Sequence, residues 1–258
     1  MCRRFPKCAL VYVAFLVLLG GSATSSPSAE PAGGGTGYKN IFRVACVGDS
    51  ITFGAGVTGR DKNSYPAVLG QWLGPKWDVR NFGVSGATLL KKGNRPYWKQ
   101  QKFTDALQFK PDVVIIKLGT NDSKHPTTGA VDAVDNWQYK AEFPTDYKAL
   151  IAQFRQVNPS VKIFTCLPVP AYPGFGGIQD VTIRGEIVPL TRQVAAESEA
   201  EVIDLYSALS GKPELFPDTV HPNNAGARLI PAAAYRALLG KERPSDPSPA
   251  SASNVSPQ

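Results

Sequence analysis

The sequence predicts an α/β fold in which a parallel sheet of five strands lies between two layers of helices. Short runs of apolar and β-branched residues alternate along the chain with longer segments of helical spacing. The run VVIIKLG is apolar almost without alternation, which is typical of a parallel strand covered on both faces. Polar residues gather just after these runs, where parallel sheets place their ligands and chemistry.

Each element follows from its local pattern. Strands are predicted at Arg43–Val47, Val79–Phe82, Asp112–Leu118, Lys162–Leu167 and Glu201–Asp204. Helices are predicted at Tyr65–Leu73, Lys99–Leu107, Pro144–Val157, Gly185–Ser198 and Asn224–Leu239. Pro189 is expected near the start of its helix or at a kink within it.

The two ends of the chain are expected to lie outside the folded domain. Three basic residues precede an apolar run over residues 9–19, followed by small residues, which is the layout of a signal peptide at 1–23. Cleavage after Ala23 and after Ala29 both fit this pattern. The alternative is a retained anchor, although eleven apolar residues are fewer than the roughly 20 that a spanning helix needs. We therefore expect export to the periplasm or the extracellular space, without stable membrane insertion after cleavage.

Composition predicts where the folded domain begins and ends. Segments 24–40 and 241–258 are rich in Ser, Pro and Gly and are predicted to be a disordered linker and a disordered tail. The remaining residues, 41–240, have the length of one domain.

Charge and cysteine usage exclude several classes of partner. The net charge of +7 falls to +4 without the three basic residues of the signal, and no long Lys/Arg block follows, so nucleic acid is not an expected partner. Outside the signal only Cys46 and Cys166 remain, each in an apolar run, and we expect buried free thiols. There is no C-x-x-C pair of metal ligands, and the serine chemistry argued below calls for no metal and no organic cofactor.

Ser50 is the candidate nucleophile. It follows the first strand in the stretch VACVGDSITFGAG, with Asp49 expected to hold the turn by hydrogen bonds to neighbouring backbone.

The same stretch begins a G-x-G-x-x-G pattern at Gly54, Gly56 and Gly59. A dinucleotide site needs the first glycine at the end of the strand and a helix opening on the last, and neither condition is met here.

His221 is the candidate general base, with Asp218 orienting it. The two lie three residues apart in the loop FPDTVHP, so the carboxylate can bind Nδ1 and turn Nε2 toward the serine. The alternative is an ordinary loop that leads into a helix. His125, the other histidine, is expected to be a solvated side chain in a polar loop.

Acyl transfer also needs hydrogen-bond donors for the oxyanion. The candidates are the backbone N–H of Ser50, the N–H of Gly86 in NFGVSGAT, and the side-chain amide of Asn121 in KLGTNDS. Asn121 also begins a glycosylation sequon, but a glycan there would fill the proposed pocket, so that interpretation is rejected.

These four blocks, GDSIT, NFGVSGAT, GTND and DTVH, occur in the order found in the SGNH, or GDSL, hydrolases, and the chain resembles that family over most of the domain. The resemblance implies a flavodoxin-like sandwich with strand order 2-1-3-4-5, which would keep Cys46 and Cys166 apart. It also implies the triad and oxyanion donors named above. A narrower resemblance is to bacterial carbohydrate esterases of the sialate O-acetylesterase type.

The predicted activity is hydrolysis of an O-acyl ester, with the acetyl group of a carbohydrate as the expected substrate. Trp98, Trp137 and Tyr172 are candidate platforms for sugar rings, or they pack loops against the domain. The basic residues Lys91, Lys92 and Arg95 could meet an acidic sugar, or they form a solvated face. A lipase or lysophospholipase and a non-enzymatic sugar-binding protein are the alternatives, and the sequence leaves the oligomeric state open.

Overall fold

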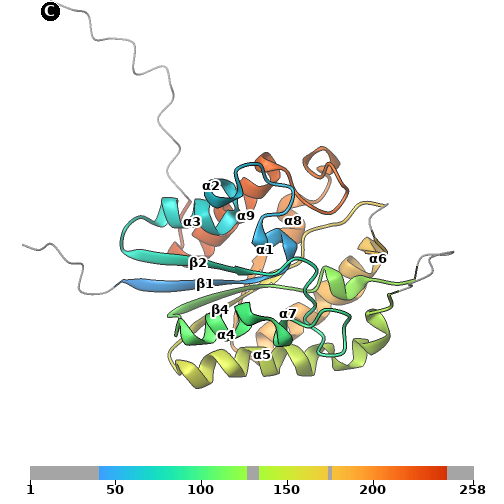
Figure 1. Ribbon diagram of the computed structural model, residues 1–258, viewed down its shortest axis with the longest axis horizontal. Coiled ribbons are helices and arrows are strands. Elements are labelled where there is room, and N and C mark those ends of the chain that lie inside the picture. The colour runs from blue at the N-terminus through green and yellow to red at the C-terminus, as the bar shows by residue number, and fades with distance from the viewer. Residues whose placement is uncertain (1–40, 127–133, 174–175, 243–258) are drawn as a thin grey trace, which may run out of the picture. The chain divides into compact units, whose positions relative to one another are not determined.

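The computed structural model contains a five-stranded parallel sheet of order β2-β1-β3-β4-β5 (Figure 1). The strands are β1 (Phe42–Gly48), β2 (Trp77–Gly83), β3 (Val113–Lys117), β4 (Lys162–Leu167) and β5 (Glu201–Asp204). The structure describes residues 41–126, 134–173 and 176–242, which all belong to one compact unit. The predicted signal peptide, the linker and the tail from residue 243 onward lie outside the described residues. The predicted fold class and strand order are confirmed.

Helices cover both faces of the sheet (Figure 1). One face carries α1 (Ser50–Phe53), α2 (Arg60–Asn63), α3 (Tyr65–Leu73), α8 (Leu205–Leu209) and α9 (Asn224–Leu239). The other carries α4 (Gln101–Gln108), α5 (Phe143–Val157) and α7 (Val188–Glu197). In the described ranges, no helix is long and apolar enough to cross a membrane.

Short helical turns connect these elements. The 3-10 turns are η1 (Tyr97–Lys99), η2 (Asn121–Ser123), η3 (Trp137–Glu142) and η5 (Pro213–Leu215). The helix predicted at Gly185–Ser198 is interrupted: α6 (Asp180–Thr182) runs into a π-helical turn, η4 (Ile183–Ile187), and α7 follows with Pro189 in its first turn. Pro189 lacks the N–H that would bond back into the preceding turn, and the regular hydrogen-bond pattern is broken in η4 just ahead of it.

Each strand of the sheet interior is buried on both faces. In β1, Val44 and Cys46 pack in the core under α3 and α9, whereas Ala45 and Val47 pack in the core under α4, α5 and α7. Side chains of a strand alternate between faces, so an uninterrupted apolar run is needed to fill both cores. Burying one such Val side chain contributes about 1.5 to 3 kcal/mol.

The two described cysteines are buried free thiols, as predicted. Cys46 lies in β1 and Cys166 in β4, and β3 separates these strands in the sheet. Burial raises the pKa of the Cys46 thiol to about 12 and also raises that of Cys166. Both thiols therefore serve as small apolar side chains.

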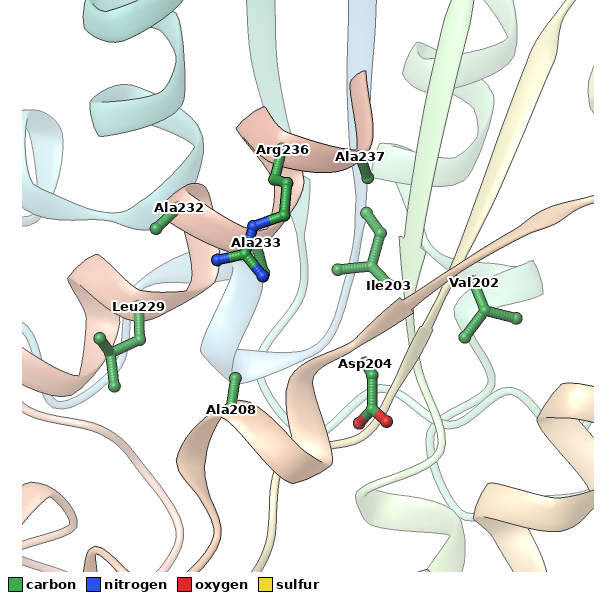
Figure 2. Close-up of a pocket in the computed structure, with 9 residues that line it drawn as sticks. All are labelled: Val202, Ile203, Asp204, Ala208, Leu229, Ala232, Ala233, Arg236 and Ala237. Carbon is green, nitrogen blue, oxygen red and sulfur yellow. The ribbon is translucent and has the colours of Figure 1, made fainter. Parts of the chain in front are cut away.

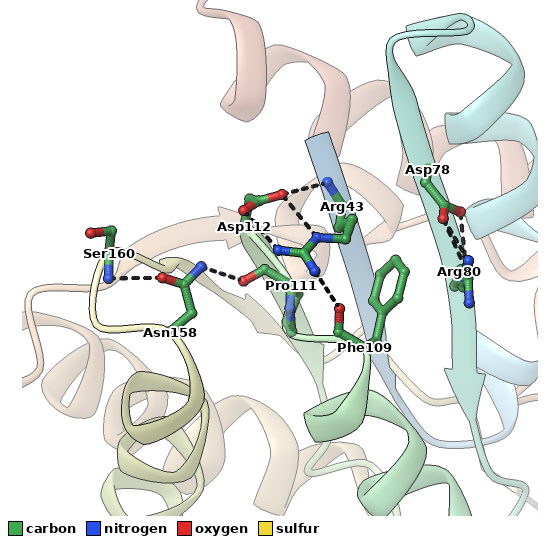
Figure 3. A network of polar contacts seen from close by, with 8 residues as sticks. All are labelled: Arg43, Asp78, Arg80, Phe109, Pro111, Asp112, Asn158 and Ser160. Atoms are coloured by element: carbon green, nitrogen blue, oxygen red, sulfur yellow. Dashed lines mark hydrogen bonds and ion pairs between the residues drawn. The ribbon is translucent and has the colours of Figure 1, made fainter. Parts of the chain in front are cut away.

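A polar network holds the amino-terminal edge of the sheet (Figure 3). Asp112 accepts from the backbone N–H of Arg43 at 2.8 Å, and the Arg43 guanidinium donates to the Phe109 carbonyl at 3.1 Å. Asn158 donates to the Pro111 carbonyl at 2.9 Å. The Arg43–Asp112 ion pair is partly exposed, so it contributes about 0 to 1 kcal/mol. These contacts set the starts of the strands, at the opposite edge from the chemistry described next.

Candidate active site

The predicted reactive residues meet at the carboxyl edge of the sheet. Ser50 is the first residue of α1, which follows directly after β1, and the residue is only 8% exposed. The segments that follow β2 and β3, the neighbours of β1 on either side, carry Gly86 and Asn121. His221 reaches the same edge from the loop that precedes α9.

The turn that carries Ser50 is held from two sides. The Asp49 carboxylate caps α1 by accepting from the N–H of Ile51 at 3.0 Å, which is the backbone role predicted for it. From β2, the Asn81 amide donates to the Thr52 carbonyl at 2.8 Å. At Gly83 an added Cβ would lie 2.6 Å from the Thr52 carbonyl carbon, so only glycine lets β2 approach the turn this closely.

Ser50, His221 and Asp218 form a continuous hydrogen-bonded chain. The Ser50 Oγ lies 2.8 Å from His221 Nε2, and His221 Nδ1 lies 2.6 Å from an Asp218 carboxylate oxygen. The other oxygen of Asp218 accepts from the backbone N–H groups of His221 at 2.7 Å and Val220 at 3.1 Å. Partial burial raises the pKa of Asp218, but these hydrogen bonds outweigh it, and the net pKa is lowered. The carboxylate is therefore held ionised toward the imidazole.

Thr219 gives this loop its shape through a strained backbone. Its φ is +74°, a left-handed conformation that is unfavourable for a β-branched residue. The surrounding bonds hold it: the Thr219 N–H donates to the Phe216 carbonyl at 2.9 Å, and its carbonyl accepts from Tyr172 at 2.7 Å. This turn lets one Asp218 oxygen accept from two successive N–H groups. Nothing in the motif DTVH predicts this left-handed backbone at Thr219.

The glycine run after Ser50 packs against the histidine. Gly54 ends α1 with φ +100°, and an added Cβ at Gly56 would lie 2.9 Å from the His221 Cβ. The loop expected after Gly59 is instead α2, so a helix of four residues does open on the last glycine of the pattern. The other condition still fails, because Gly54 lies six residues after Gly48, the last residue of β1. The dinucleotide interpretation stays rejected on this geometry, and Gly56 instead gives His221 the space it occupies.

The three predicted oxyanion donors each have an N–H without an acceptor in the described residues. The Ser50 N–H is the first of α1, a position without an intrahelical acceptor. Gly86 has φ +77°, and its N–H has no acceptor within the described residues. The Asn121 amide donates one N–H to the Ala87 carbonyl at 3.1 Å, and an amide has a second to offer. All three groups therefore have an N–H to offer, and their role as oxyanion donors stays a prediction.

Asp122, which sequence reasoning missed, ties the Asn121 segment to the Gly86 loop. Its two carboxylate oxygens accept from the N–H groups of Leu89 at 3.0 Å and Leu90 at 2.8 Å. Complete burial raises its pKa to about 6 despite these hydrogen bonds. Asn121 is itself 4% exposed, which leaves no room for a glycan at the sequon.

The candidate sugar platforms all have packing roles in the domain. Trp137 is 2% exposed, so it presents no ring face to a substrate, and that prediction is corrected. The Trp98 indole donates to the Leu89 carbonyl at 2.9 Å, and the Tyr172 ring packs against Phe216 with centroids 5.3 Å apart. For Trp98 and Tyr172, both partly buried, contact with substrate stays a prediction.

Two of the three basic residues near Gly86 are already paired. Lys91 and Lys92 form ion pairs at 3.4 Å and 2.7 Å with carboxylates of α5 and η3. Arg95 makes no side-chain hydrogen bond or ion pair within the described ranges, and its Cδ would lie 3.4 Å from a Cβ added to Gly86. Of this group, Arg95 is exposed and has no side-chain partner in the described ranges, so its contact with an acidic sugar stays a prediction.

His125 is not simply solvated. Its Nε2 lies 3.0 Å from the hydroxyl of Thr182, and its Nδ1 lies 3.7 Å from Asp135. It therefore joins the segment after β3 to α6. Within residues 41–126, 134–173 and 176–242, no group of three or more His, Cys, Asp or Glu side chains is placed to hold a metal ion.

A pocket of about 490 Å³ lies elsewhere, between β5, α8 and α9 (Figure 2). Its walls are mostly alanine and other apolar side chains. Its two charged residues have partners, because Asp204 pairs with Arg192 at 2.7 Å and Arg236 pairs with Glu242. None of the predicted catalytic residues lines it, so this hollow is separate from the candidate active site.

Comparison with known proteins assigns the family. Residues 46–229 match the model of the GDSL-like lipase/acylhydrolase family. An acetylxylan esterase of Xylanibacter ruminicola is 39% identical to this chain over 210 residues. The match covers 74% of this chain and only 42% of the length of that relative. In the crystal structure of an acetyl xylan esterase, 24% identical, 77% of this chain superposes on the whole of that chain with a TM-score of 0.58. The crystal structure of the lipase/acylhydrolase from Enterococcus faecalis is also 24% identical. In that comparison 80% of this chain superposes on the whole of that chain, with a TM-score of 0.59. The fold, the four sequence blocks and the matched residues together establish that the chain belongs to the GDSL-like lipase/acylhydrolase family.

Proposed function

We propose that the chain is a serine esterase that hydrolyses O-acyl esters of carbohydrates, with acetate as the acyl group. The observation that carries this proposal is the chain of contacts from Ser50 Oγ to His221 Nε2 and from His221 Nδ1 to Asp218, at 2.8 Å and 2.6 Å. Binding alone would not require these three side chains in this order.

The proposed reaction has two steps of the same kind. His221 takes the proton of the Ser50 hydroxyl as the oxygen attacks the acyl carbonyl, and Asp218 stabilises the imidazolium that forms. The oxyanion accepts from the N–H groups of Ser50 and Gly86 and from the Asn121 amide. The sugar alkoxide leaves with the proton from His221, and water then hydrolyses the acyl-enzyme in the same way.

The substrate class is supported by similarity to a carbohydrate esterase. The chain shares 39% identity with the acetylxylan esterase of Xylanibacter ruminicola, although over less than half of that relative's length. The family also includes lipases, which would use the same catalytic residues and differ in the acyl pocket. A non-enzymatic sugar-binding protein is the alternative from another class.

Acyl-length profiling of the purified chain tests the proposal. We expect turnover of 4-nitrophenyl acetate and of acetylated xylo-oligosaccharides, and little turnover of a long-chain ester at equal concentration. Ser50→Ala should abolish turnover, whereas Ser210→Ala, at an exposed serine, should leave it unchanged. Preference for the long-chain ester would favour a lipase, and full activity of Ser50→Ala would exclude the proposed mechanism.

We also propose that the enzyme acts outside the cytoplasm. This rests on the basic residues Arg3, Arg4 and Lys7 ahead of the apolar run over 9–19. Expression of the full chain in a bacterial host followed by N-terminal sequencing of the exported protein should find a new start near residue 24 or 30. An intact N-terminus on membrane-bound protein would instead indicate a retained anchor.

A further inference from the structure

A lysine side chain is completely buried at the carboxyl end of β3. Lys117 is 0% exposed and ends the otherwise apolar strand VVIIK. An ammonium group is costly to bury unless its charge is balanced and each N–H has an acceptor. Lys117 Nζ has three such contacts, to the two carboxylate oxygens of Asp49 at 2.9 Å and 3.1 Å and to the Thr120 hydroxyl at 2.7 Å. These match the three donors of the group.

Each acceptor of Lys117 is the residue immediately before a group of the candidate active site. Asp49 precedes Ser50, and it holds the turn by also accepting from a backbone N–H of α1. Thr120 precedes Asn121, whose amide is one of the oxyanion donors. The Thr120 carbonyl in turn accepts from the Ser123 hydroxyl at 2.8 Å, which ties in the rest of the η2 turn.

We propose that Lys117 is a positioning residue for the ester hydrolysis proposed above: its ammonium group joins the nucleophile turn to the segment that carries Asn121. The inference rests on that proposed function. Register supports it, because Lys117 pairs with Gly48 across β1 and β3, so the two loops leave the sheet side by side. A Cβ added to Gly48 would lie 2.5 Å from the Lys117 carbonyl oxygen, so the strands are close at this point.

Stability alone does not account for the buried pair. Replacing a buried ion pair by apolar or neutral side chains is often neutral for folding, whereas removing one partner is strongly destabilising. Catalysis is more demanding, because a displacement of about 1 Å in a reacting group can cost about 100-fold in rate. The pair lies where such a displacement would separate Ser50 from one of its oxyanion donors.

The test compares Lys117→Met with the double variant Asp49→Asn/Lys117→Met. The single variant leaves a buried carboxylate without its cation and should unfold at lower urea concentration. The double variant has no unpaired charge, and the new amide oxygen can still accept from the N–H of Ile51. We expect its urea midpoint to recover toward the wild-type value, whereas kcat per titrated active site stays 10- to 100-fold low with KM unchanged.

Thr120→Val provides a second variant that is nearly isosteric. It removes one acceptor of the ammonium and no charge, and we expect a several-fold lower kcat at unchanged KM. Lys148→Met is the control, because Lys148 is an exposed lysine on α5 that pairs with Glu197 on α7. Its kcat and urea midpoint should match those of the wild type. Wild-type kcat in either the double variant or Thr120→Val would overturn the proposal.

Failure of the proposed function would look different. In that case the wild-type chain itself would neither hydrolyse acetate esters nor be labelled at Ser50 by a fluorophosphonate. A labelled, active wild type with fully active Lys117 variants would overturn only the positioning role.

Discussion

Asp218→Asn tests the catalytic chain at its least buried member. Asp218 uses one oxygen for two backbone N–H groups and the other for His221 Nδ1 at 2.6 Å. An asparagine can keep the two backbone bonds with its amide oxygen, which leaves its NH2 group facing Nδ1. The imidazole must then accept at Nδ1 and carry its proton on Nε2, where it cannot take the proton of Ser50.

The expected loss follows from the alternatives open to the amide. Turning its oxygen toward His221 would place the NH2 group against two backbone N–H groups, at about 1 to 3 kcal/mol for each donor left unsatisfied. The side chain at position 218 is 42% exposed, so the amide of the variant can also turn into solvent, where it no longer orients His221. We therefore expect kcat to fall by about 10³- to 10⁴-fold, or about 4 to 5.5 kcal/mol of activation free energy.

The assay is steady-state hydrolysis of 4-nitrophenyl acetate at pH 7, with urea unfolding of each variant to verify its fold. Asp61→Asn is the matched control, because that carboxylate is 93% exposed on α2 and should leave kcat unchanged. If Asp218→Asn is folded and retains more than about a tenth of the wild-type kcat, Asp218 does not orient His221 and the reasoning is refuted.

Three further predictions address the surrounding residues. Gly83→Ala should destabilise the fold by more than about 2 kcal/mol and lower kcat, measured by urea unfolding and turnover, because a Cβ there would lie 2.2 Å from the Phe53 amide nitrogen. Asp122 has a folded pKa near 6 against an ordinary 3.8, so its contribution to stability is full below pH 3.8 and is lost as pH rises through 6. The unfolding free energy of the wild type minus that of Asp122→Asn should accordingly fall between pH 4 and 6, by at most about 1.4 kcal/mol per pH unit, and a flat difference would contradict it. Arg95→Gln should raise KM several-fold for an acetylated acidic sugar and not for a neutral one, and an equal change for both would assign Arg95 to the solvated face.

The parts of the fold and site that the sequence predicts are those with a local signal. A parallel strand buried on both faces is a continuous apolar run, so the inner strands β1, β3 and β4 lie where their runs do, and the edge strands β2 and β5 follow shorter, mixed runs. Ser50 and His221 were recognisable because each lies in a short polar block just after a strand or before a helix. Helices α2 and α8 were missed, because helices of four or five residues are too short to show a 3.6-residue period.

The remaining features depend on contacts between distant residues or on backbone angles. The sequence predicts that Lys117 has a partner, because it is a charged residue at the end of an apolar strand. It does not predict which residue that is, because Asp49 lies 68 positions away in the chain. The left-handed backbone of Thr219 has no marker in a residue type that rarely adopts it. The aromatic side chains gave an ambiguous signal, because the same ring can pack a loop or meet a sugar, and Trp137 packs.

The carboxylates of the site divide into two kinds by burial, and the division indicates how the site works. Asp49 and Asp122 are 0% exposed and bind backbone N–H groups of the loops that carry Ser50 and border Gly86. Asp218 is 42% exposed and binds the imidazole. A group that must stabilise a transient imidazolium benefits from a lowered pKa, which hydrogen bonds supply at a partly solvated position. A group that must hold two loops together benefits instead from burial, where each hydrogen bond is stronger and costly to break. On this argument, substitutions of the buried carboxylates should act on both stability and kcat, whereas Asp218→Asn, which can keep both backbone hydrogen bonds, should act on kcat almost alone.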